Sequence, residues 1–317
     1  MNPKLRVASE RRLGWFNRAD VLAAGYSDAE LRSRLRRGVW SRLGRDAFVE
    51  HGDWPADEPP WDRARRLHLL AVRSVTERLD GAVVSHQSAA VVHGLPLWGL
   101  DLSRVHVTRP TGRIRSNASL SLHRSPIGPD ELTEVSGLRV TTVERAIAET
   151  ACGTSYEVGV VLGDAALRDR LTTPEQLVST AERHRHWPGS PAARAAAQFA
   201  NALSESVGET RLRVLMDNHR LPPAELQVEI RGNEGDLIAR VDFLLGQVLI
   251  VEFDGALKYG DGAATVVAEK WREDRLRERG YSVVRTSWSD LDHPAATAAR
   301  LYRALASHPR PCDQPRS

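Results

Sequence analysis

The chain is poor in cysteine and lysine and has no long apolar run, and each shortage excludes a class of protein. Only Cys152 and Cys312 are present among 317 residues, too few for a disulfide framework or a cysteine-based metal cluster. The longest apolar run, at 248–251, is far shorter than the about 18 residues that a membrane-spanning helix needs. No apolar stretch follows Lys4, so we expect no secretory signal, no membrane association and a cytoplasmic protein.

Lysine is scarce among the basic residues, because 44 positions are Lys or Arg and only Lys4, Lys258 and Lys270 are lysine. The formal net charge of +3 is unevenly distributed along the chain. The first fifty residues hold eleven basic and six acidic side chains, which gives +5 in that segment alone. A basic segment of this kind is typical of contact with a phosphate backbone.

The length and composition are those of a folded chain with more than one domain. Hydrophobic residues make up 41% and charged residues 27% of the sequence, a balance that allows real cores. At about 100–200 residues per domain, the length predicts two or three domains. The patterns described below place them at residues 1–58, 59–190 and 200–308.

Residues 14–50 have the pattern of two capped helices followed by a hairpin. Asn17 is placed to cap a helix over 18–24, and Ser27 to Glu30 form a capping box that opens a second helix ending at Gly38. Strands at 39–42 and 47–49 then flank Gly44, as the strands of a wing would. This order predicts a winged helix-turn-helix that binds double-stranded DNA, and the alternative is an arginine-rich helix that is only solvated. The arginines expected to contact DNA are Arg32, Arg34, Arg36, Arg37 and Arg42.

Residues 61–180 predict a mixed α/β region without a phosphate-binding loop or a nucleophile elbow. We expect helices over 61–79, 85–94, 142–152 and 156–170 and one that begins at 173, and strands over 82–84, 105–108, 120–123 and 138–141. His86 and His93 fall on a short helix, and His184 and His186 lie in a basic stretch. Because no carboxylate or thiol stands at ligand spacing from them, we expect structural or solvated histidines and not metal ligands.

Several segments of these two regions occur together in one known family. They are Gly14 to Val49, Ser85-His-Gln-Ser-Ala-Ala-Val-Val-His-Gly-Leu-Pro, Val105-His-Val-Thr-Arg-Pro and Gly137-Leu-Arg-Val-Thr-Thr. With them, about half of the chain resembles the AbiEi-type antitoxin family of type IV toxin–antitoxin systems. The resemblance implies a winged-helix DNA binder that often represses its own operon. It also suggests a cognate toxin or a homodimer as the protein partner.

Residues 206–306 predict the order helix, three strands, helix and strand, with carboxylates near the strand ends. Glu209 lies on the first helix (206–218), Asp242 ends the second strand (237–243), and Glu252 and Asp254 end the third (248–253). Asp242 and Glu252 belong to partner strands of a hairpin, and Glu252 and Asp254 are two residues apart, so we expect all three on one face. Clustered carboxylates repel one another unless a hard cation neutralises them, which predicts a Mg²⁺ or Mn²⁺ site.

The same segment resembles the PD-(D/E)XK nuclease superfamily, and most of all its branch related to the very-short-patch-repair endonucleases. The matching residues are Gly208-Glu-Thr-Arg-Leu-Arg, Gln227, Arg240-Val-Asp-Phe, Val251-Glu-Phe-Asp-Gly and Arg275-Leu-Arg-Glu-Arg-Gly-Tyr, spread over about one hundred residues. The fold class expected for the whole chain is therefore α+β multidomain, with a winged helix, a mixed α/β domain and an αβββαβ restriction-endonuclease-like domain.

The nuclease resemblance also implies roles for individual residues. The implied metal ligands are the carboxylates of Asp242 and Glu252 and the backbone carbonyl of Phe253. Gln227 and Arg275 would support the site. Asp254 stands where the superfamily more often has lysine, so Lys258 or Lys270 must supply the basic group. The expected catalytic residues are thus Asp242, Glu252, Asp254, Lys258, Lys270 and Glu209.

Three functions are compatible with these patterns. The first is a metal-dependent endonuclease that the winged helix delivers to DNA, where it hydrolyses phosphodiester bonds. The second is a non-enzymatic, antitoxin-like repressor that uses the nuclease-like domain only for binding. The third is a toxin–antitoxin fusion in one chain. The combination of Asp242, Glu252 and a nearby lysine favours the endonuclease.

Overall fold

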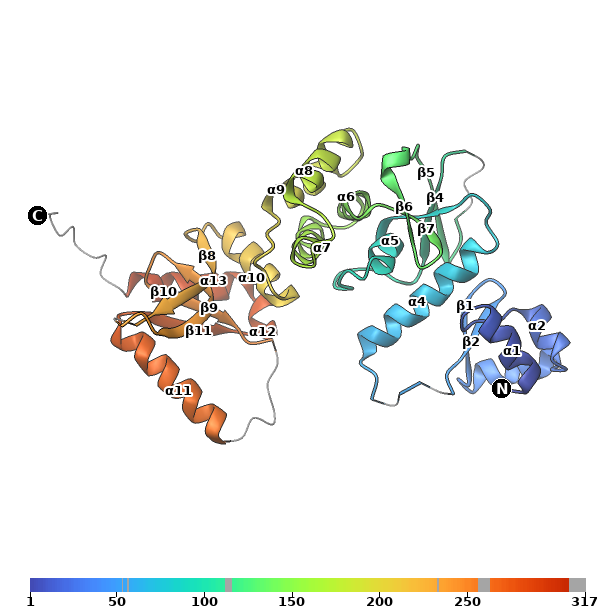
Figure 1. Ribbon diagram of the computed structural model, residues 1–317, viewed down its shortest axis with the longest axis horizontal. Helices are drawn as coiled ribbons and strands as arrows, with labels where there is room; N and C mark the ends of the chain where they lie inside the picture. The colour runs from blue at the N-terminus through green and yellow to red at the C-terminus, as the bar shows by residue number, and fades with distance from the viewer. Residues whose placement is uncertain (53, 56, 112–115, 233, 256–262, 308–317) are drawn as a thin grey trace, which may run out of the picture. The chain divides into compact units, whose positions relative to one another are not determined.

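The computed structural model describes residues 1–317 except 53, 56, 112–115, 233, 256–262 and 308–317, and the side chains of 263–269 are also left undescribed. The chain is a mixed α+β protein with several sheets (Figure 1). It forms two compact units, Met1–Gly163 with Leu171–Phe199, and Asp164–Arg170 with Ala200–Ser317. No helix in the described ranges combines the length and the apolar character needed to cross a membrane.

The first unit begins with three helices and a two-stranded hairpin. These are α1 (Pro3–Arg11), α2 (Arg18–Ala23), α3 (Asp28–Arg36), β1 (Trp40–Gly44) and β2 (Ala47–Glu50). Both predicted capping boxes form, at Asn17 before α2 and at Ser27 before α3. The hairpin strands pair antiparallel as predicted. Helix α1 was not predicted, and its Leu5 is fully buried in the core that also contains Phe16 and Trp40.

The rest of the first unit is a five-stranded sheet with helices. The strands are β3 (Val83–Val84), β4 (Val105–Arg109), β5 (Leu120–Arg124), β6 (Leu132–Val135) and β7 (Leu138–Thr141), in the order β5-β4-β3-β7-β6. The helices are α4 (Pro60–Thr76), α5 (His86–Val92), α6 (Val143–Gly153), α7 (Tyr156–Arg168), α8 (Pro174–Arg183) and α9 (Ser190–Phe199), with a short 3-10 turn at Pro129–Glu131. The last residues of α7, from Asp164 onward, belong to the second unit.

The predicted helices and strands of this region are confirmed, but β6 and α9 were missed. Strand β6 lies at the edge of the sheet and contains no fully buried residue, so its sequence lacks an apolar signal. Helix α9 is rich in alanine, with only Phe199 as a large apolar residue. The sheet core is built from small and β-branched side chains of α4, β3, β4 and β7, including Val72, Val84, Val107 and Val140.

The second unit follows the predicted order of helix, three strands, helix and strand. Its elements are α10 (Val207–Asn218), β8 (Ala224–Arg231), β9 (Leu237–Leu245), β10 (Leu249–Phe253), α11 (Ala263–Glu278) and β11 (Ser282–Thr286), followed by α12 (Trp288–Leu291) and α13 (Pro294–Ala306). The sheet order is β11-β10-β9-β8. Strands β8, β9 and β10 pair antiparallel, and β11 pairs parallel to β10.

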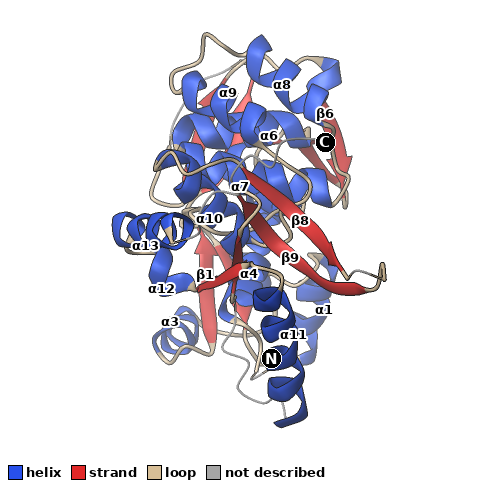
Figure 2. Ribbon diagram, turned by 90° about the vertical axis from the view of Figure 1, so that its left-hand side faces the viewer, coloured by secondary structure: helices blue, strands red, loops and turns tan. Residues whose placement is uncertain are grey.

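Helices cover both faces of this sheet. Side chains of α10, α12 and α13 pack with Leu249 and Val251 of β10, whereas Leu276 of α11 packs with Ile250. Successive residues of a strand point to opposite faces, so α11 lies on the face opposite α10 and α13 (Figure 2). This division decides which carboxylates at the strand ends can meet.

Candidate functional site

The arginines predicted to contact DNA lie on α3 and at the start of the hairpin. Arg32, Arg36, Arg37 and Arg42 are exposed. Arg32 and Arg36 are one helical turn apart on α3, so they share a face of that helix. Arg34 is half-buried, and its guanidinium lies 4.7 Å from the ring centroid of Tyr26 and 5.1 Å from that of Trp40. Arg42 also lies over an aromatic ring, 5.1 Å from the centroid of Phe48, but it is exposed. Arg34 therefore packs against the core aromatics, and the other four present exposed side chains.

Three predicted site residues of the second unit come together, and we call Glu209, Gln227 and Asp242 the carboxylate cluster. Glu209 lies in the first turn of α10, whose start Ser206 caps. The Nε2 atom of Gln227 on β8 donates to Glu209 Oε2 at 3.1 Å, and the Gln227 side chain lies close enough to Asp242 to lower the pKa of its carboxyl. Asp242 Oδ2 accepts from the Phe253 amide at 2.8 Å. The cluster thus joins a helix and three strands at one point.

The strand backbone is irregular at this point. Gln227 has a φ of +53°, in the left-handed region that non-glycine residues rarely adopt. The pairing of β8 with β9 is regular on both sides, with Leu226 opposite Phe243 and Val228 opposite Val241, while Gln227 and Asp242 are not paired. Such a conformation costs on the order of 1–3 kcal/mol and is commonly retained at functional sites.

Without a bound cation, the charged forms of the two carboxyl groups in the carboxylate cluster are disfavoured. Burial raises the pKa of Asp242, and the nearby Glu205 raises it further. Burial also raises the pKa of Glu209, which is 8% exposed, and Asp242 contributes to that increase. Two carboxylates whose pKa values are both raised form an all-oxygen donor set, which suits a hard divalent cation.

The structure does not bring Glu252 and Asp254 to this cluster. Arg272 Nη2 of α11 lies 3.0 Å from both carboxylate oxygens of Glu252. Asp254 is exposed, and its amide donates to the Thr286 carbonyl at 2.7 Å. Within the described ranges, Asp242, Glu252 and Asp254 do not form a group whose ligand atoms lie within 4.8 Å of one another.

The expectation that Asp242, Glu252 and Asp254 share one face of the sheet assumed regular strand pairing, and that pairing ends before these residues. The β9–β10 register runs only to Phe243 opposite Val251. Beyond it, the Asp242 side chain accepts from the Phe253 amide and lies beside Gln227 and Glu209 on the α10 side. Glu252 follows Val251, which packs with α10, so its side chain points to the α11 face.

The remaining predicted site residues lie outside this cluster or outside the described chain. Lys258 falls in the undescribed stretch 256–262. Lys270 lies on α11 and is exposed. Arg275 forms an ion pair with Asp236 in the β8–β9 turn, with 2.5 Å between Nη2 and Oδ2. None of these three observations assigns a catalytic role.

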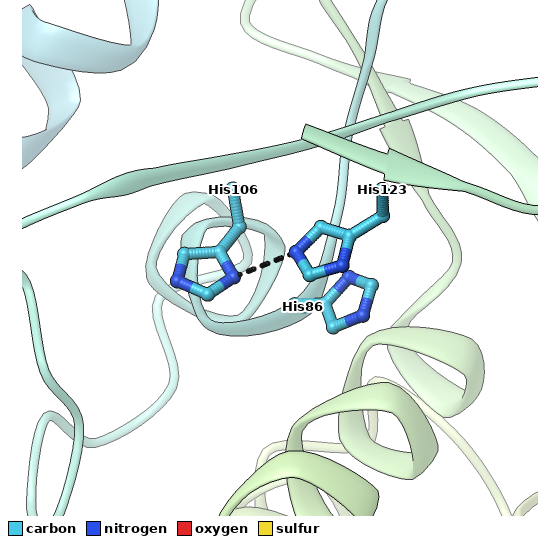
Figure 3. A group of neighbouring side chains, drawn as sticks. All are labelled: His86, His106 and His123. Atoms are coloured by element: carbon cyan, nitrogen blue, oxygen red, sulfur yellow. Dashed lines mark hydrogen bonds between the residues drawn. The ribbon is translucent and has the colours of Figure 1, made fainter. Parts of the chain in front are cut away.

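A second polar cluster lies in the first unit, and we call His86, His106 and His123 the histidine cluster (Figure 3). Each histidine offers one ring nitrogen, and these nitrogens lie within 4.8 Å of one another. The residues come from α5, β4 and β5 and are separated by 20 and 17 positions, so ligand spacing along the sequence could not reveal them. The available signal was a single histidine on each of two apolar strands that pair side by side.

Comparisons with known proteins give relatives but no function. No family model matches the chain. Two proteins from Mycobacterium tuberculosis are each 29% identical to it over 277 residues, covering 86% of this chain and 97% of their own length. They are Uncharacterized protein MT2308 of strain CDC 1551 / Oshkosh and Uncharacterized protein Rv2248 of strain ATCC 25618 / H37Rv. An alignment of this length includes residues of both compact units.

Proposed function

We propose that this chain binds double-stranded DNA through its N-terminal region and hydrolyses phosphodiester bonds at the carboxylate cluster with Mg²⁺ or Mn²⁺. The observation that carries the proposal is the meeting of Glu209, Gln227 and Asp242 beside the Phe253 backbone. Two further features support it. The second unit has the order and strand pairing expected of an αβββαβ nuclease-like domain, and its sequence resembles that superfamily.

Each residue of the cluster has a separate task in this proposal. Asp242 and Glu209 would hold the cation through carboxylate oxygens, together with the backbone carbonyl of Phe253. When bound, such a cation activates water and stabilises the charge that develops on phosphorus. Gln227 positions both carboxylates through its side-chain amide. Glu252 is engaged by Arg272, so it would reach the cation only by leaving that ion pair.

The N-terminal helices and hairpin would deliver DNA to this site. We infer that α2, α3 and the β1–β2 hairpin act as a winged helix-turn-helix, in which α3 approaches the duplex. Exposed arginines on α3 and β1 provide the cations that contact with the phosphate backbone requires. The cytoplasmic location and a toxin or a second copy of the chain as partner remain predictions.

One observation favours a second candidate, the non-enzymatic repressor. The ion pair between Glu252 and Arg272 satisfies a carboxylate that a nuclease of this type is expected to use. A domain that only binds DNA would have no need to release it. The two candidates share the DNA-binding region and differ in whether DNA is cut.

Cleavage of supercoiled plasmid in the presence of Mg²⁺ or Mn²⁺ separates the two candidates. We expect the wild type to nick the plasmid and Asp242→Asn to lose at least about 100-fold in rate, because it removes an anionic ligand. Asp217→Asn, an exposed position on α10, is the matched control and should cut normally. All three proteins should bind DNA equally. Full cleavage by Asp242→Asn would exclude the carboxylate cluster, and DNA binding without any cleavage would favour the repressor.

A further inference from the structure

The histidine cluster has nearly the spacing of a three-nitrogen metal site. His106 Nδ1 and His123 Nε2 are 3.0 Å apart, and the rings of His86 and His123 stack with their centroids 3.6 Å apart. A tetrahedral zinc site with bonds of about 2.0–2.1 Å separates its ligand nitrogens by about 3.3 Å. The first pair is therefore already close to ligand spacing, and the His86 ring, which stacks at 15° on that of His123, must turn out of the stack to complete the set.

The three imidazoles are neutral, which is the form that binds metals. Burial lowers the pKa of His106 to about 4, lowers that of His86 well below its ordinary value, and lowers that of His123. A neutral imidazole has one nitrogen with a free lone pair. His106 Nδ1 and His123 Nε2 face each other with one hydrogen between them. If a cation took that place, the hydrogen would move to the other ring nitrogen of the same histidine, which would stay neutral.

The buried carboxylate of Glu149 contacts His86 at its Nδ1 atom and its backbone amide. The Nδ1 atom of His86 lies 3.0 Å from Ser85 Oγ and 3.4 Å from Glu149 Oε2, and the His86 amide donates to the same carboxylate oxygen at 3.0 Å. Metal-binding histidines usually donate their second ring N–H to such a partner, which fixes the tautomer and the ring orientation. In His86 this arrangement leaves Nε2 as the nitrogen with the lone pair.

A buried ion pair lies behind the cluster. Arg145 is fully buried and pairs with two carboxylates, Glu149 and Glu131. Arg183 and His184 also contact Glu131, so that acid has further partners. Glu149 therefore bears on the cluster through its direct contact with His86 and not through an excess of negative charge.

The backbone at His86 is held in an unfavourable conformation. His86 is the first residue of α5 and has a φ of +52°. A non-glycine residue in the left-handed region persists only where the surrounding structure imposes it, and such residues concentrate at functional sites. With this backbone conformation, the His86 ring stacks on the His123 ring.

The cluster opens into a cavity of about 500 Å³, which is lined by the three histidines together with Glu149, Cys152 and Trp187. Structural zinc sites are closed by four protein ligands, whereas sites with three protein ligands leave the fourth position to water or substrate. The histidine cluster supplies three ligands and has space next to them.

We propose that His86, His106 and His123 bind one Zn²⁺ ion, with Glu149 positioning His86 and the fourth coordination position open to the cavity. This site is separate from the carboxylate cluster and does not depend on the nuclease proposal. It differs from that cluster in donor type, because imidazole nitrogen favours zinc and related transition metals over Mg²⁺.

Zinc titration of the chelator-stripped full chain tests the proposal. We expect one high-affinity Zn²⁺ per wild-type chain and at least a 100-fold loss of affinity in His123→Gln. Glu149→Gln keeps all three ligands and should lose about 10–100-fold, as expected for an outer partner of a ligand. His186→Gln, an exposed histidine of the same unit, and Asp242→Asn should bind zinc as the wild type does. Unchanged zinc affinity in a folded His123→Gln protein would overturn the proposal.

A measurement on the wild type avoids any effect of the substitutions on folding. X-ray absorption at the zinc edge should show three imidazole nitrogens at about 2.0–2.1 Å, completed by one light-atom ligand such as water. A sulfur ligand or an all-oxygen shell would overturn the proposal, since the first would indicate a cysteine and the second the carboxylates.

Discussion

The histidine cluster and the carboxylate cluster are built in the same way from different donors. Each gathers side chains from three elements around a non-glycine residue with positive φ, His86 at +52° and Gln227 at +53°. One offers three neutral nitrogens, and the other offers carboxylate oxygens. Burial therefore acts in opposite senses on the two donor sets.

Burial favours the metal-binding form of the histidines and disfavours the metal-binding form of the carboxylates. Lowering a histidine pKa favours the neutral form, which is the ligand. Raising the pKa of Asp242 and Glu209 disfavours the charged form, which is the ligand there. A cation at the carboxylates would therefore relieve a cost that the apo protein carries, whereas a cation at the histidines would meet donors that are already in the required state.

The largest expected effect comes from removing the cation behind the histidine cluster. Arg145→Met leaves the buried Glu149 without its arginine and removes one partner of Glu131, and we expect a loss of about 3–5 kcal/mol in the free energy of unfolding. Arg194→Met is the control, because that half-exposed residue pairs with Glu182 at the surface and should cost no more than about 1 kcal/mol. Thermal and urea unfolding measure both variants. Equal losses would mean that Arg145 does not balance the two acids.

A smaller loss of stability is expected when a side chain is added next to the carboxylate cluster. A Cβ atom at Gly208, beside Glu209 on α10, would lie 1.9 Å from Cε1 of Phe253. Gly208→Ala should therefore shift Phe253 and cost about 1–3 kcal/mol of stability, with slower cleavage. Gly153→Ala has open space around its Cβ and should change little. The comparison of melting temperatures and nicking rates checks this, and wild-type behaviour of Gly208→Ala would contradict the assigned position of Phe253.

The cost of the buried Asp242 charge should appear as a pH-dependent stability. Its folded pKa is raised, so the charged form destabilises the fold above the unfolded pKa of about 3.9, and the cost disappears when both states are protonated. With a chelator present, Asp242→Asn should raise the free energy of unfolding by up to about 1 kcal/mol at pH 7. This figure is reduced because Asp242 is partly exposed. Near pH 3 the substitution should not change the free energy of unfolding. Melting temperatures across this pH range measure the gain. A stability loss at pH 7 would contradict the account.

The smallest effect on stability is expected at α3, the helix proposed to contact DNA, where substitutions leave both clusters intact. Replacing Arg32 and Arg36 together with alanine should lower the slope of log affinity against log salt by about 1.8, at about 0.9 per lost phosphate contact. The melting temperature should stay nearly unchanged, because both side chains are exposed. Arg34→Ala should behave in the opposite way, since Arg34 stacks on Tyr26 and Trp40. An unchanged salt slope in the double variant would remove α3 from the DNA interface.

Patterns among neighbouring residues predicted most of the fold. The features that they missed depend on contacts between residues far apart in the sequence. The capping boxes at Asn17 and Ser27 and the element order from α10 to β11 depend on neighbouring residues, and the structure contains them. The partner of Glu252 is twenty residues away on α11, and the irregular pairing at Gln227 and Asp242 cannot be read from strand alternation. The histidine cluster likewise requires the sheet to bring β4, β5 and the start of α5 together.

The central claim is that a hard cation binds between Glu209 and Asp242 and not at Glu252. Mn²⁺ affinity of the wild type, Asp242→Asn, Glu209→Gln and Glu252→Gln, followed by electron paramagnetic resonance of the free ion, tests it most directly. The account predicts at least about a tenfold loss of affinity in Asp242→Asn and in Glu209→Gln, and near wild-type affinity in Glu252→Gln, whose carboxylate pairs with Arg272. Loss of Mn²⁺ binding in Glu252→Gln with full binding in Glu209→Gln would contradict it.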